Sequence, residues 1–341
     1  MRLWIDLANS PHVPFFKALA RRFIAQGHEI ETSAREFAET IPLAHAAGFK
    51  PYVTGVHGGR AVSAKAGTLM SRAWALARWA RKRRIDLAIS HNSYSQIVAA
   101  RALRIKNVTL MDYEYQPANH LAFRLSSRII VPASFPEESL RRFGASAAKV
   151  RRYHGTKEDV YLADFEPDPS FGKRLCELGV KTDNVLVLMR PPAHDALYHR
   201  FQNTLFDEAL SMLLADARVQ VILLPRSEAQ RSVYSARAGE NLIVPDAPLD
   251  GANLIAASDL VISAGGTINR EAAALGVPAA SIYAGKWAAV DEGLMKEHRL
   301  TRIAEADQLR DLAIRKKERV KPRRSVNVID EVVQLIFDRM S

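Results

Sequence analysis

The segment of residues 258–283, SDLVISAGGTINREAAALGVPAASIY, constrains the fold more than any other part of the chain. Residues 260–262 form a short apolar run without polar alternation, as in strands that a parallel sheet buries on both faces. Gly265 and Gly266 follow, and the alanine-rich residues 267–275 then predict a helix that Gly276 and Pro278 end. Residues 279–283 begin a second strand. The segment therefore predicts the strand–turn–helix–strand unit of an α/β domain.

The glycine turn in this segment has two interpretations. The free N–H groups and the positive dipole end of the following helix would suit a phosphate group. Glycines also allow the ordinary sharp connection between a strand and a helix in any α/β domain. Spacing alone leaves both interpretations open.

The composition indicates a globular protein of two domains. A chain of 341 residues is long for one domain. The sequence has no run of about 18 apolar residues, so it predicts no transmembrane helix. Its single cysteine, Cys176, excludes an internal disulfide and fits a reducing compartment. The N-terminus, MRLWIDLANS, begins directly with a strand-like pattern and not with a signal peptide. We therefore expect a cytoplasmic protein.

The net charge of +11 predicts attraction to anions, which include nucleic acid, anionic lipid and phosphorylated small molecules. Basic residues cluster at 81–84 and 315–324. Neither cluster is interleaved with aromatic residues, as a single-strand nucleic-acid platform would be, and no nucleic-acid motif is present. We interpret the clusters as solvated helix ends and do not expect a nucleic-acid partner.

Strand and helix patterns alternate along both halves of the chain. A segment rich in Pro and Asp, residues 161–172, separates the halves and predicts a linker. In the first half we predict strands 3–7, 29–32, 87–90, 108–111 and 128–131, helices 14–26, 37–47, 69–84, 96–103 and 120–125, and a loop at 54–67. In the second half we predict strands 184–189, 220–224, 242–244, 260–262 and 279–283, and helices 195–215, 227–239, 253–257 and 267–275.

This alternation predicts two doubly wound parallel sheets. We place the first Rossmann-like domain at residues 1–164, completed by an amphipathic closing helix within residues 326–341. The second domain spans residues 165–325. Two such domains facing across a cleft would bind a ligand between them.

Polar residues that directly follow the predicted strands are the candidates for function, because ligands of open α/β sheets bind outside the carboxyl ends of the strands. In the first half these residues are Asn9, Ser10, His12, His91, Asn92, Ser93, Tyr94, Asp112, Tyr113 and Glu114. In the second half they are Arg190, His194, Arg226, Ser263, Gly265, Gly266, Thr267, Gly285, Lys286 and Trp287. If the protein transfers a group between two substrates, Asn9, Ser10, His91, Asn92 and Tyr94 would line the side of the substrate that accepts the group.

Three of these residues are candidates for proton transfer. His12 lies between two prolines in SPHVP and has an ordinary pKa near neutrality, so it suits general acid–base chemistry. The alternative is a histidine that caps the following helix. Asp112 and Glu114 on the DYEY turn could orient a sugar hydroxyl or act as base. The alternative for these carboxylates is a loop pair with its hydrogen bonds satisfied.

Two charged residues of the second half are candidates for ligand binding. Glu271 lies on the first turns of the helix after the glycines, where a carboxylate can accept two hydrogen bonds from a vicinal diol such as a ribose. It could equally be a favourable charge near a helix N-terminus. Arg190 ends a very apolar strand and precedes two prolines, which favours a phosphate-binding role over a surface role.

The predicted helix 69–84 carries Trp74, Trp79 and a basic tail. This combination could rest on an anionic membrane surface, so a peripheral membrane contact is one interpretation. The alternative is that both tryptophans belong to the core.

Several segments resemble proteins of the GT-B fold. AASDLVISAGGTINREAAALGVPA resembles the donor-nucleotide segment of two families, the lipid II-forming N-acetylglucosaminyltransferases and the UDP-N-acetylglucosamine 2-epimerases. HVPFFKALARRFIAQGHEI resembles their first loop and helix. RYHGTKEDVYLADFEPD and MRPPAHDALY resemble domain-of-unknown-function family 354, a set of GT-B-like proteins, and this resemblance covers nearly the whole chain. The resemblance implies a GT-B-type fold.

The resemblance also implies roles for individual residues. The turn of Gly265, Gly266 and Thr267 would approach a diphosphate, and Glu271 would bind the ribose hydroxyls. The sequence departs from both families. ANSPHVP replaces the glycine-rich first loop of the transferases, although His12 matches their loop histidine. The epimerases carry a histidine–arginine signature after the first strand of their second domain. In this chain only the arginine has a counterpart, Arg190.

The leading hypothesis is a metal-independent glycosyltransferase with a UDP-like sugar donor and no other cofactor. Cell-surface polysaccharide or glycolipid synthesis would be the setting. Lys286 would help to neutralise the leaving diphosphate and Asp291 would contact the sugar. A nucleotide-sugar 2-epimerase or hydrolase is the alternative enzyme, and a non-catalytic nucleotide-sugar-binding protein is the third hypothesis. The sequence specifies neither the acceptor, the stereochemical outcome nor the oligomeric state.

Overall fold

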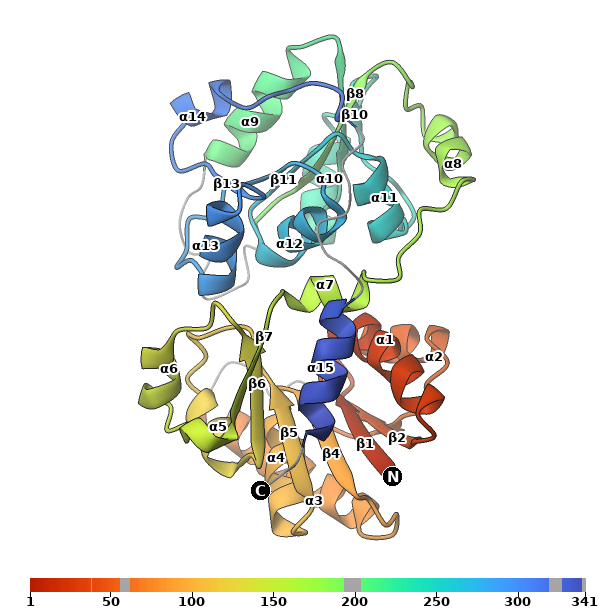
Figure 1. The fold of residues 1–341 in the computed structure, drawn as a ribbon. Coiled ribbons are helices and arrows are strands. Elements are labelled where there is room, and N and C mark those ends of the chain that lie inside the picture. Colours follow the sequence, from red (N-terminus) through yellow and green to blue (C-terminus); the bar gives the residue numbers. More distant parts are fainter. Residues whose placement is uncertain (38, 56–61, 193–203, 319–326, 339–341) are drawn as a thin grey trace. The chain divides into compact units, whose positions relative to one another are not determined.

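The computed structural model of the chain describes residues 1–37, 39–55, 62–192, 204–318 and 327–338. The chain forms two compact units, each with its own parallel sheet (Figure 1). The N-terminal unit comprises residues 1–163 together with the C-terminal helix α15 (Asn327–Phe337). The C-terminal unit begins at Asp164. No helix of the described residues is long and apolar enough to cross a membrane.

The N-terminal unit has a seven-stranded parallel sheet in the order β3-β2-β1-β4-β5-β6-β7. The order reverses between β1 and β4, which makes this point the topological switch where doubly wound sheets bind ligands. The strands are β1 (Arg2–Leu7), β2 (Glu29–Ala34), β3 (Tyr52–Val53), β4 (Leu87–His91), β5 (Lys106–Leu110), β6 (Arg128–Pro132) and β7 (Val150–Tyr153).

Helices cover both faces of this sheet (Figure 1). One face packs against α1, α7 and α15, and the other against α3, α4 and α5. In α1, Val13, Phe16 and Phe23 recur at helical spacing and are buried, which fixes the face that meets the sheet. The helices are α1 (His12–Ala25), α2 (Thr40–Ala46), α3 (Val62–Ala80), α4 (Tyr94–Ala102), α5 (Asn119–Leu125), α6 (Glu137–Arg142) and α7 (Lys157–Tyr161), with a 3₁₀ turn at Ala147–Lys149.

The C-terminal unit has a six-stranded parallel sheet in the order β10-β9-β8-β11-β12-β13. Its switch point lies between β8 and β11. The strands are β8 (Val185–Arg190), β9 (Val219–Leu223), β10 (Leu242–Ile243), β11 (Leu260–Ser263), β12 (Ala279–Ser281) and β13 (Thr301–Arg302). The helices are α8 (Phe171–Glu177), α9 (Leu205–Leu214), α10 (Glu228–Ser235), α11 (Gly251–Ala257), α12 (Gly266–Leu275), α13 (Ala289–Lys296) and α14 (Asp307–Arg310).

The predicted fold class, two doubly wound α/β units, is confirmed, and the differences lie in short elements. β3, β7 and β13 were not predicted, because β7 reads VRRY and the other two have only two residues each, so none shows an apolar run. The helices α6, α13 and α14 were not predicted either. α3 begins at Val62, within the predicted loop 54–67, and part of that loop lies outside the described residues. α7 and α8 extend into the predicted linker. His194 and the first part of the predicted helix 195–215 also lie outside the described residues.

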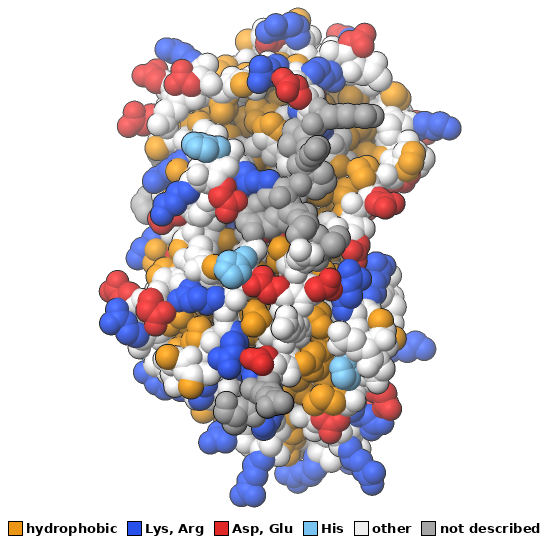
Figure 2. All heavy atoms as spheres, viewed as in Figure 1, with side chains coloured by type: hydrophobic (Ala, Val, Ile, Leu, Met, Phe, Trp, Pro, Cys, Tyr) orange, Lys and Arg blue, Asp and Glu red, His pale blue; other side chains and the backbone are white. Residues whose placement is uncertain are grey.

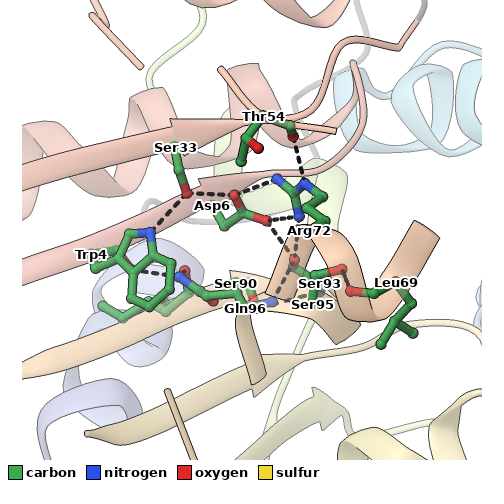
Figure 3. A network of polar contacts seen from close by, with 11 residues as sticks. Trp4, Asp6, Ser33, Thr54, Leu69, Arg72, Ser90, Ser93, Ser95 and Gln96 are labelled. Carbon is green, nitrogen blue, oxygen red and sulfur yellow. Dashed lines mark hydrogen bonds and ion pairs between the residues drawn. The ribbon is translucent and has the colours of Figure 1, made fainter. Parts of the chain in front are cut away.

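A buried ion pair ties β1 to α3 (Figure 3). Asp6 is 0% exposed, and its two carboxylate oxygens accept hydrogen bonds from Arg72 of α3 at 2.8 and 2.9 Å. Ser33 of β2 also donates to Asp6 at 2.5 Å, and Ser93 donates from the start of α4. Arg72 Nε donates to the carbonyl of Thr54 at 2.8 Å. Every charged atom of the pair therefore has a partner, as burial of charge requires.

We predict that Asp6→Asn destabilises the protein by about 3–5 kcal/mol, because it leaves the buried Arg72 guanidinium without a counter-charge. Urea unfolding followed by circular dichroism measures the change. The matched control is Asp330→Asn, whose carboxylate is 61% exposed and pairs with Arg22 at 3.2 Å in the same unit. The control should cost at most about 1 kcal/mol. Equal losses for both variants would contradict the prediction.

Candidate functional site

Two histidines meet at the switch point of the N-terminal unit. His12 is the first residue of α1, and its N–H donates to the carbonyl of Asn9 at 3.0 Å. Asn9 Oδ1 also accepts from the N–H of Ser10 at 2.9 Å, so ANSP forms a tight turn between β1 and α1. This turn places the ring of His12 beside the ring of His91, the last residue of β4, with centroids 5.0 Å apart.

Charged side chains gather next to His91. Asp112 follows β5, and its Oδ1 lies 3.6 Å from His91 Nε2. Lys157 Nζ donates to the other oxygen, Oδ2, at 3.0 Å and lies 3.7 Å from Glu158. All four side chains are less than 10% exposed. The group places an imidazole, a carboxylate and an ammonium within contact distance of one another, and side chains of these types act as general acids and bases.

The imidazole of His12 is held in its neutral form. Burial lowers the pKa of His12 well below its usual range, and the positive charges of His91 and Lys157 lower it further, while Asp112 opposes them. Its Nδ1 atom is buried and has no hydrogen-bond partner among the described residues. A neutral imidazole at neutral pH can accept a proton, so His12 suits a general base.

The structure places the other predicted residues of this unit around the same strand ends. Asn92, in the left-handed conformation with φ of 59°, donates to the hydroxyl of Tyr94 at 2.6 Å. Burial raises the pKa of this hydroxyl. Ser10 Oγ lies 3.3 Å from Thr40 Oγ1. Glu114 is buried at 3% exposure after β5.

The glycine turn of the C-terminal unit is held by side-chain hydrogen bonds. Ser263 ends β11, and its hydroxyl accepts from the N–H of Gly265 at 3.1 Å. Asn269, one turn into α12, donates to the carbonyl of Gly265 at 3.0 Å and to that of Ser263 at 3.3 Å. α12 begins at Gly266 and ends at Leu275, and Gly276 caps its end in the left-handed conformation. The first N–H groups of α12 therefore lie next to a fixed turn.

Three arginines surround this turn. A Cβ atom on Gly265 would lie 2.5 Å from the guanidinium of Arg226, and a Cβ atom on Gly266 would lie 2.9 Å from that of Arg270. Arg226 is held by a hydrogen bond from its Nε to the carbonyl of Pro191 at 2.7 Å. Arg190 ends β8, beside Ser263 in the sheet. The absence of a side chain on both glycines is what allows the guanidinium groups to approach the turn.

The charges around the turn are unevenly paired. Burial lowers the pKa of Arg190, and the nearby carboxylate of Glu271 opposes this shift. Arg190 Nε is buried and meets no hydrogen-bond partner in the part of the chain that the structure describes. Arg270, by contrast, forms a two-point ion pair with Asp291 at 2.7 and 3.1 Å. Both oxygens of Asp291, the residue expected to contact the sugar, are therefore engaged within the domain.

The remaining predicted residues lie near the same strand ends. Thr267 and Glu271 are half-buried on α12, and Lys286 is exposed after β12. The sequence interpretation missed Lys157, Arg270 and Asn269, because each lies inside a helix and not directly after a strand. The GTKED segment gave one signal, since Thr156 and Asp159 form a capping box that fixes the start of α7 at Lys157.

No three His, Cys, Asp or Glu side chains of the described residues form a group that could hold a metal ion. Two other groups of side chains could hold a ligand, the acid–base group of the N-terminal unit and the arginines of the C-terminal unit. The second set suits an anion with several oxygens, since guanidinium groups bind phosphate oxygens through paired N–H donors.

Comparison with solved structures identifies the class of this architecture as GT-B. The putative UDP-N-acetylglucosamine 2-epimerase of Listeria monocytogenes superimposes with a TM-score of 0.73 at 16% identity, over 98% of this chain and 95% of that one. The Methanocaldococcus jannaschii UDP-GlcNAc 2-epimerase in complex with UDP-GlcNAc and UDP gives 0.74 at 13% identity, over 98% and 99%. The spinosyn rhamnosyltransferase SpnG with spinosyn aglycone gives 0.58 at 15% identity, over 91% and 90%.

The chain belongs to the family described as Protein of unknown function (DUF354), whose model matches residues 1–341. An uncharacterized protein of Methanocaldococcus jannaschii is 26% identical over 346 residues, which cover 99% of this chain and 97% of that protein. The expected family and the expected GT-B fold are both confirmed.

We predict that His12→Gln weakens the pH dependence of stability. As the pH falls from neutrality, the unfolded chain protonates His12 near its ordinary pKa of about 6.5, whereas the folded chain keeps it neutral. Protons then bind preferentially to the unfolded chain, so the wild type loses unfolding free energy between that pH and its lower folded pKa. Urea unfolding at a series of pH values should show a shallower loss for His12→Gln.

His45→Gln on α2 is the matched control, because it removes an imidazole that is already exposed to solvent in the folded chain. The same pH profile for wild type and His12→Gln would contradict the neutral, buried state of His12.

Proposed function

We propose that the C-terminal unit binds the diphosphate of a nucleotide sugar at the N-terminus of α12. The observation that carries this proposal is the convergence of Arg190, Arg226 and Arg270 on the Gly265–Gly266 turn. A diphosphate offers several charged oxygens, and arginine forms strong charge-assisted hydrogen bonds with such oxygens. The helix dipole and the free N–H groups of α12 favour negative charge at the same place.

The buried Nε atom of the half-buried Arg190 supports the same ligand. A donor atom without a partner costs about 1–3 kcal/mol when buried, and a phosphate oxygen would satisfy it. Glu271 lies on α12, near Arg190 at the end of β8. In this position its carboxylate could accept hydrogen bonds from a ribose diol. In this proposal Arg270 binds the diphosphate, and Asp291 holds Arg270 in place instead of contacting the sugar.

The proposed reaction is the transfer of the sugar to a hydroxyl acceptor. His12 would take the proton from the acceptor hydroxyl, whose oxygen would form a bond to the anomeric carbon of the sugar. The bond from that carbon to the diphosphate would break, and the nucleoside diphosphate would leave with its charge stabilised by the arginines. Lys157 would hold Asp112 beside His91, so that the carboxylate can stabilise positive charge on the imidazoles. Glu114, Asn92 and Tyr94 would help to bind the acceptor, and Lys286 would add charge near the leaving group.

The comparisons support a nucleotide sugar as the ligand. The solved structures that share this fold include a UDP-GlcNAc 2-epimerase in complex with UDP-GlcNAc and UDP, and a rhamnosyltransferase. The names of both enzymes refer to sugars. The charge of the site favours a diphosphate, and a nucleotide sugar contains both a sugar and a diphosphate. We propose a UDP-like donor for this chain on these grounds.

The alternative reaction is 2-epimerisation or hydrolysis of the nucleotide sugar without an acceptor. Epimerases are prominent among the similar solved structures, and the group of His91, Asp112 and Lys157 offers both a proton donor and a proton acceptor. A protein that binds the nucleotide sugar without turnover is the third candidate.

We predict that UDP binds the wild type and that Arg190→Met weakens binding by roughly tenfold or more, because a charge-assisted hydrogen bond contributes about 1.5–3 kcal/mol. Isothermal titration calorimetry measures the affinity. Gly265→Ala should weaken binding without unfolding the domain, since its φ of −150° suits alanine but the new Cβ would displace the flexible guanidinium of Arg226. Arg218→Met, whose side chain is 80% exposed at another edge, is the matched control. Equal affinities for all four proteins would contradict this site.

We further predict that turnover of UDP-GlcNAc requires an acceptor hydroxyl, and that His12→Gln reduces kcat by about 100-fold or more. Mass spectrometry of the products separates the candidates. UDP release or inversion at C2 without acceptor would instead indicate the epimerase or hydrolase, and binding without any product would indicate the non-catalytic protein.

A further inference from the structure

One face of α3 exposes apolar and basic side chains in a single row. Met70 is 57% exposed and Trp74 is 67% exposed. Arg78 lies four residues after Trp74, and Arg81 lies three residues after Arg78, directly beyond the last residue of α3. The N–H of Arg81 still donates to the carbonyl of Ala77, so this spacing places all four on one face. The guanidinium of Arg78 lies 5.6 Å from the ring of Trp74. We refer to these four residues as the α3 stripe.

Trp74 differs from the other tryptophans of the chain. Trp4, Trp79 and Trp287 are 0%, 8% and 7% exposed. One interpretation of the sequence placed Trp79 with Trp74 on a membrane surface, and the other placed both in the core. Trp79 packs in the core, with its ring centroid 5.6 Å from that of Trp4. Trp74 contributes nothing to that core. A large indole left in solvent costs hydrophobic free energy, which favours a surface that covers it.

A basic cluster adjoins the α3 stripe. Parallel strands begin at one edge of a sheet, and the helices that connect them end at that same edge. Exposed basic residues accumulate there after α3, at the end of α4 and at the start of β5. They are Arg81, Lys82, Arg84, Arg101, Arg104 and Lys106. Figure 2 shows Lys and Arg side chains projecting from this end of the N-terminal unit, at the bottom of the view. We call these six residues the basic edge.

The acidic residues Glu29 and Asp86 at this edge are outnumbered by the six exposed basic residues. Glu29 accepts two hydrogen bonds from the Arg2 side chain, the shorter at 2.7 Å, and Asp86 accepts from the Arg2 backbone at 2.7 Å. Basic residues at the ends of helices also offset the helix dipole. That role, however, does not explain why Met70 and Trp74 stand exposed beside them.

We propose that the α3 stripe and the basic edge dock this protein on an anionic membrane surface. Trp and Met side chains insert among lipid headgroups and upper acyl chains, and an amphipathic helix then lies in the plane of the interface. Each Lys or Arg close to an anionic leaflet adds to the attraction, and the basic edge holds six exposed basic side chains. Nucleic acid fits less well, because the stripe has one exposed aromatic residue and not a series on which bases stack.

Vesicle binding tests the proposal. The purified full chain should co-sediment with vesicles of phosphatidylglycerol and phosphatidylcholine in equal parts, and far less with pure phosphatidylcholine. High salt should weaken the binding, since it screens exposed charges. Because the other three tryptophans are buried, a blue shift of the intrinsic fluorescence on vesicle addition would report Trp74. Trp74→Phe should lose this shift and retain most of the binding.

Two variants separate the apolar and charged contributions. Trp74→Ala and the double variant Arg81→Glu, Lys82→Glu should each weaken vesicle partitioning, the double variant by roughly tenfold or more. Ile24→Ala on α1, at a side chain that is 62% exposed, is the control for the first. Arg141→Glu with Arg142→Glu, exposed on α6, is the control for the second. UDP affinity should remain unchanged in all of these variants, which separates this test from that of the nucleotide site.

Three results would overturn the proposal. The first is equal binding to neutral and anionic vesicles, or none to either. The second is binding of a duplex oligonucleotide at physiological salt that Arg81→Glu, Lys82→Glu abolishes while vesicle binding is absent. The third is a homodimer, seen by light scattering, that Trp74→Ala dissociates, because a second copy of the chain would then cover the stripe.

Discussion

The N-terminal unit depends on a single buried carboxylate. Asp6 lies on β1, beside the switch point of the sheet, and binds Arg72 of α3, Ser33 of β2 and Ser93 at the start of α4. Ser93 also caps α4 by accepting from the N–H of Gln96. His91 lies two residues before Ser93 in the chain, and His12 lies six residues after Asp6. Asp6 therefore positions, through its hydrogen bonds, the backbone segments that carry both histidines. Removing it would loosen three elements at once, since each contributes a hydrogen bond to the same two oxygens.

The two units share a topology but place different chemistry at their switch points. In the first, the strand ends carry imidazole, carboxylate and ammonium groups, which exchange protons. In the second, the equivalent position carries guanidinium groups around a glycine turn, which bind anions and do not exchange protons at neutral pH. Two units of one topology thus carry groups of different chemistry at the same position of the sheet, titratable groups in one and permanent positive charges in the other.

The sequence revealed the strand–turn–helix pattern of residues 258–283 because apolar runs, glycines and helix stops are local signals. It also singled out His12, His91 and Asp112, because ligands of open α/β sheets bind at the carboxyl ends of the strands, and the structure brings these three side chains together. It could not reveal Lys157 or Arg270, whose places depend on how α7 and α12 pack. The partner of Asp291 likewise depends on packing, since Arg270 lies on a different helix. Pairings across elements have no signature in residue spacing.

The position of α15 has a consequence for the order of folding. Val328, Ile329, Val332 and Ile336 of this helix are buried in the core of the N-terminal unit, next to α1 and α7. In topological terms the C-terminal unit is an insertion within the other unit. During synthesis the core of the N-terminal unit is therefore incomplete until the ribosome has translated the whole C-terminal unit and then α15. Until then the side of the core that α15 covers stays exposed. An exposed apolar face of that kind is a natural binding site for chaperones, whereas the second unit can close its core without the last helix.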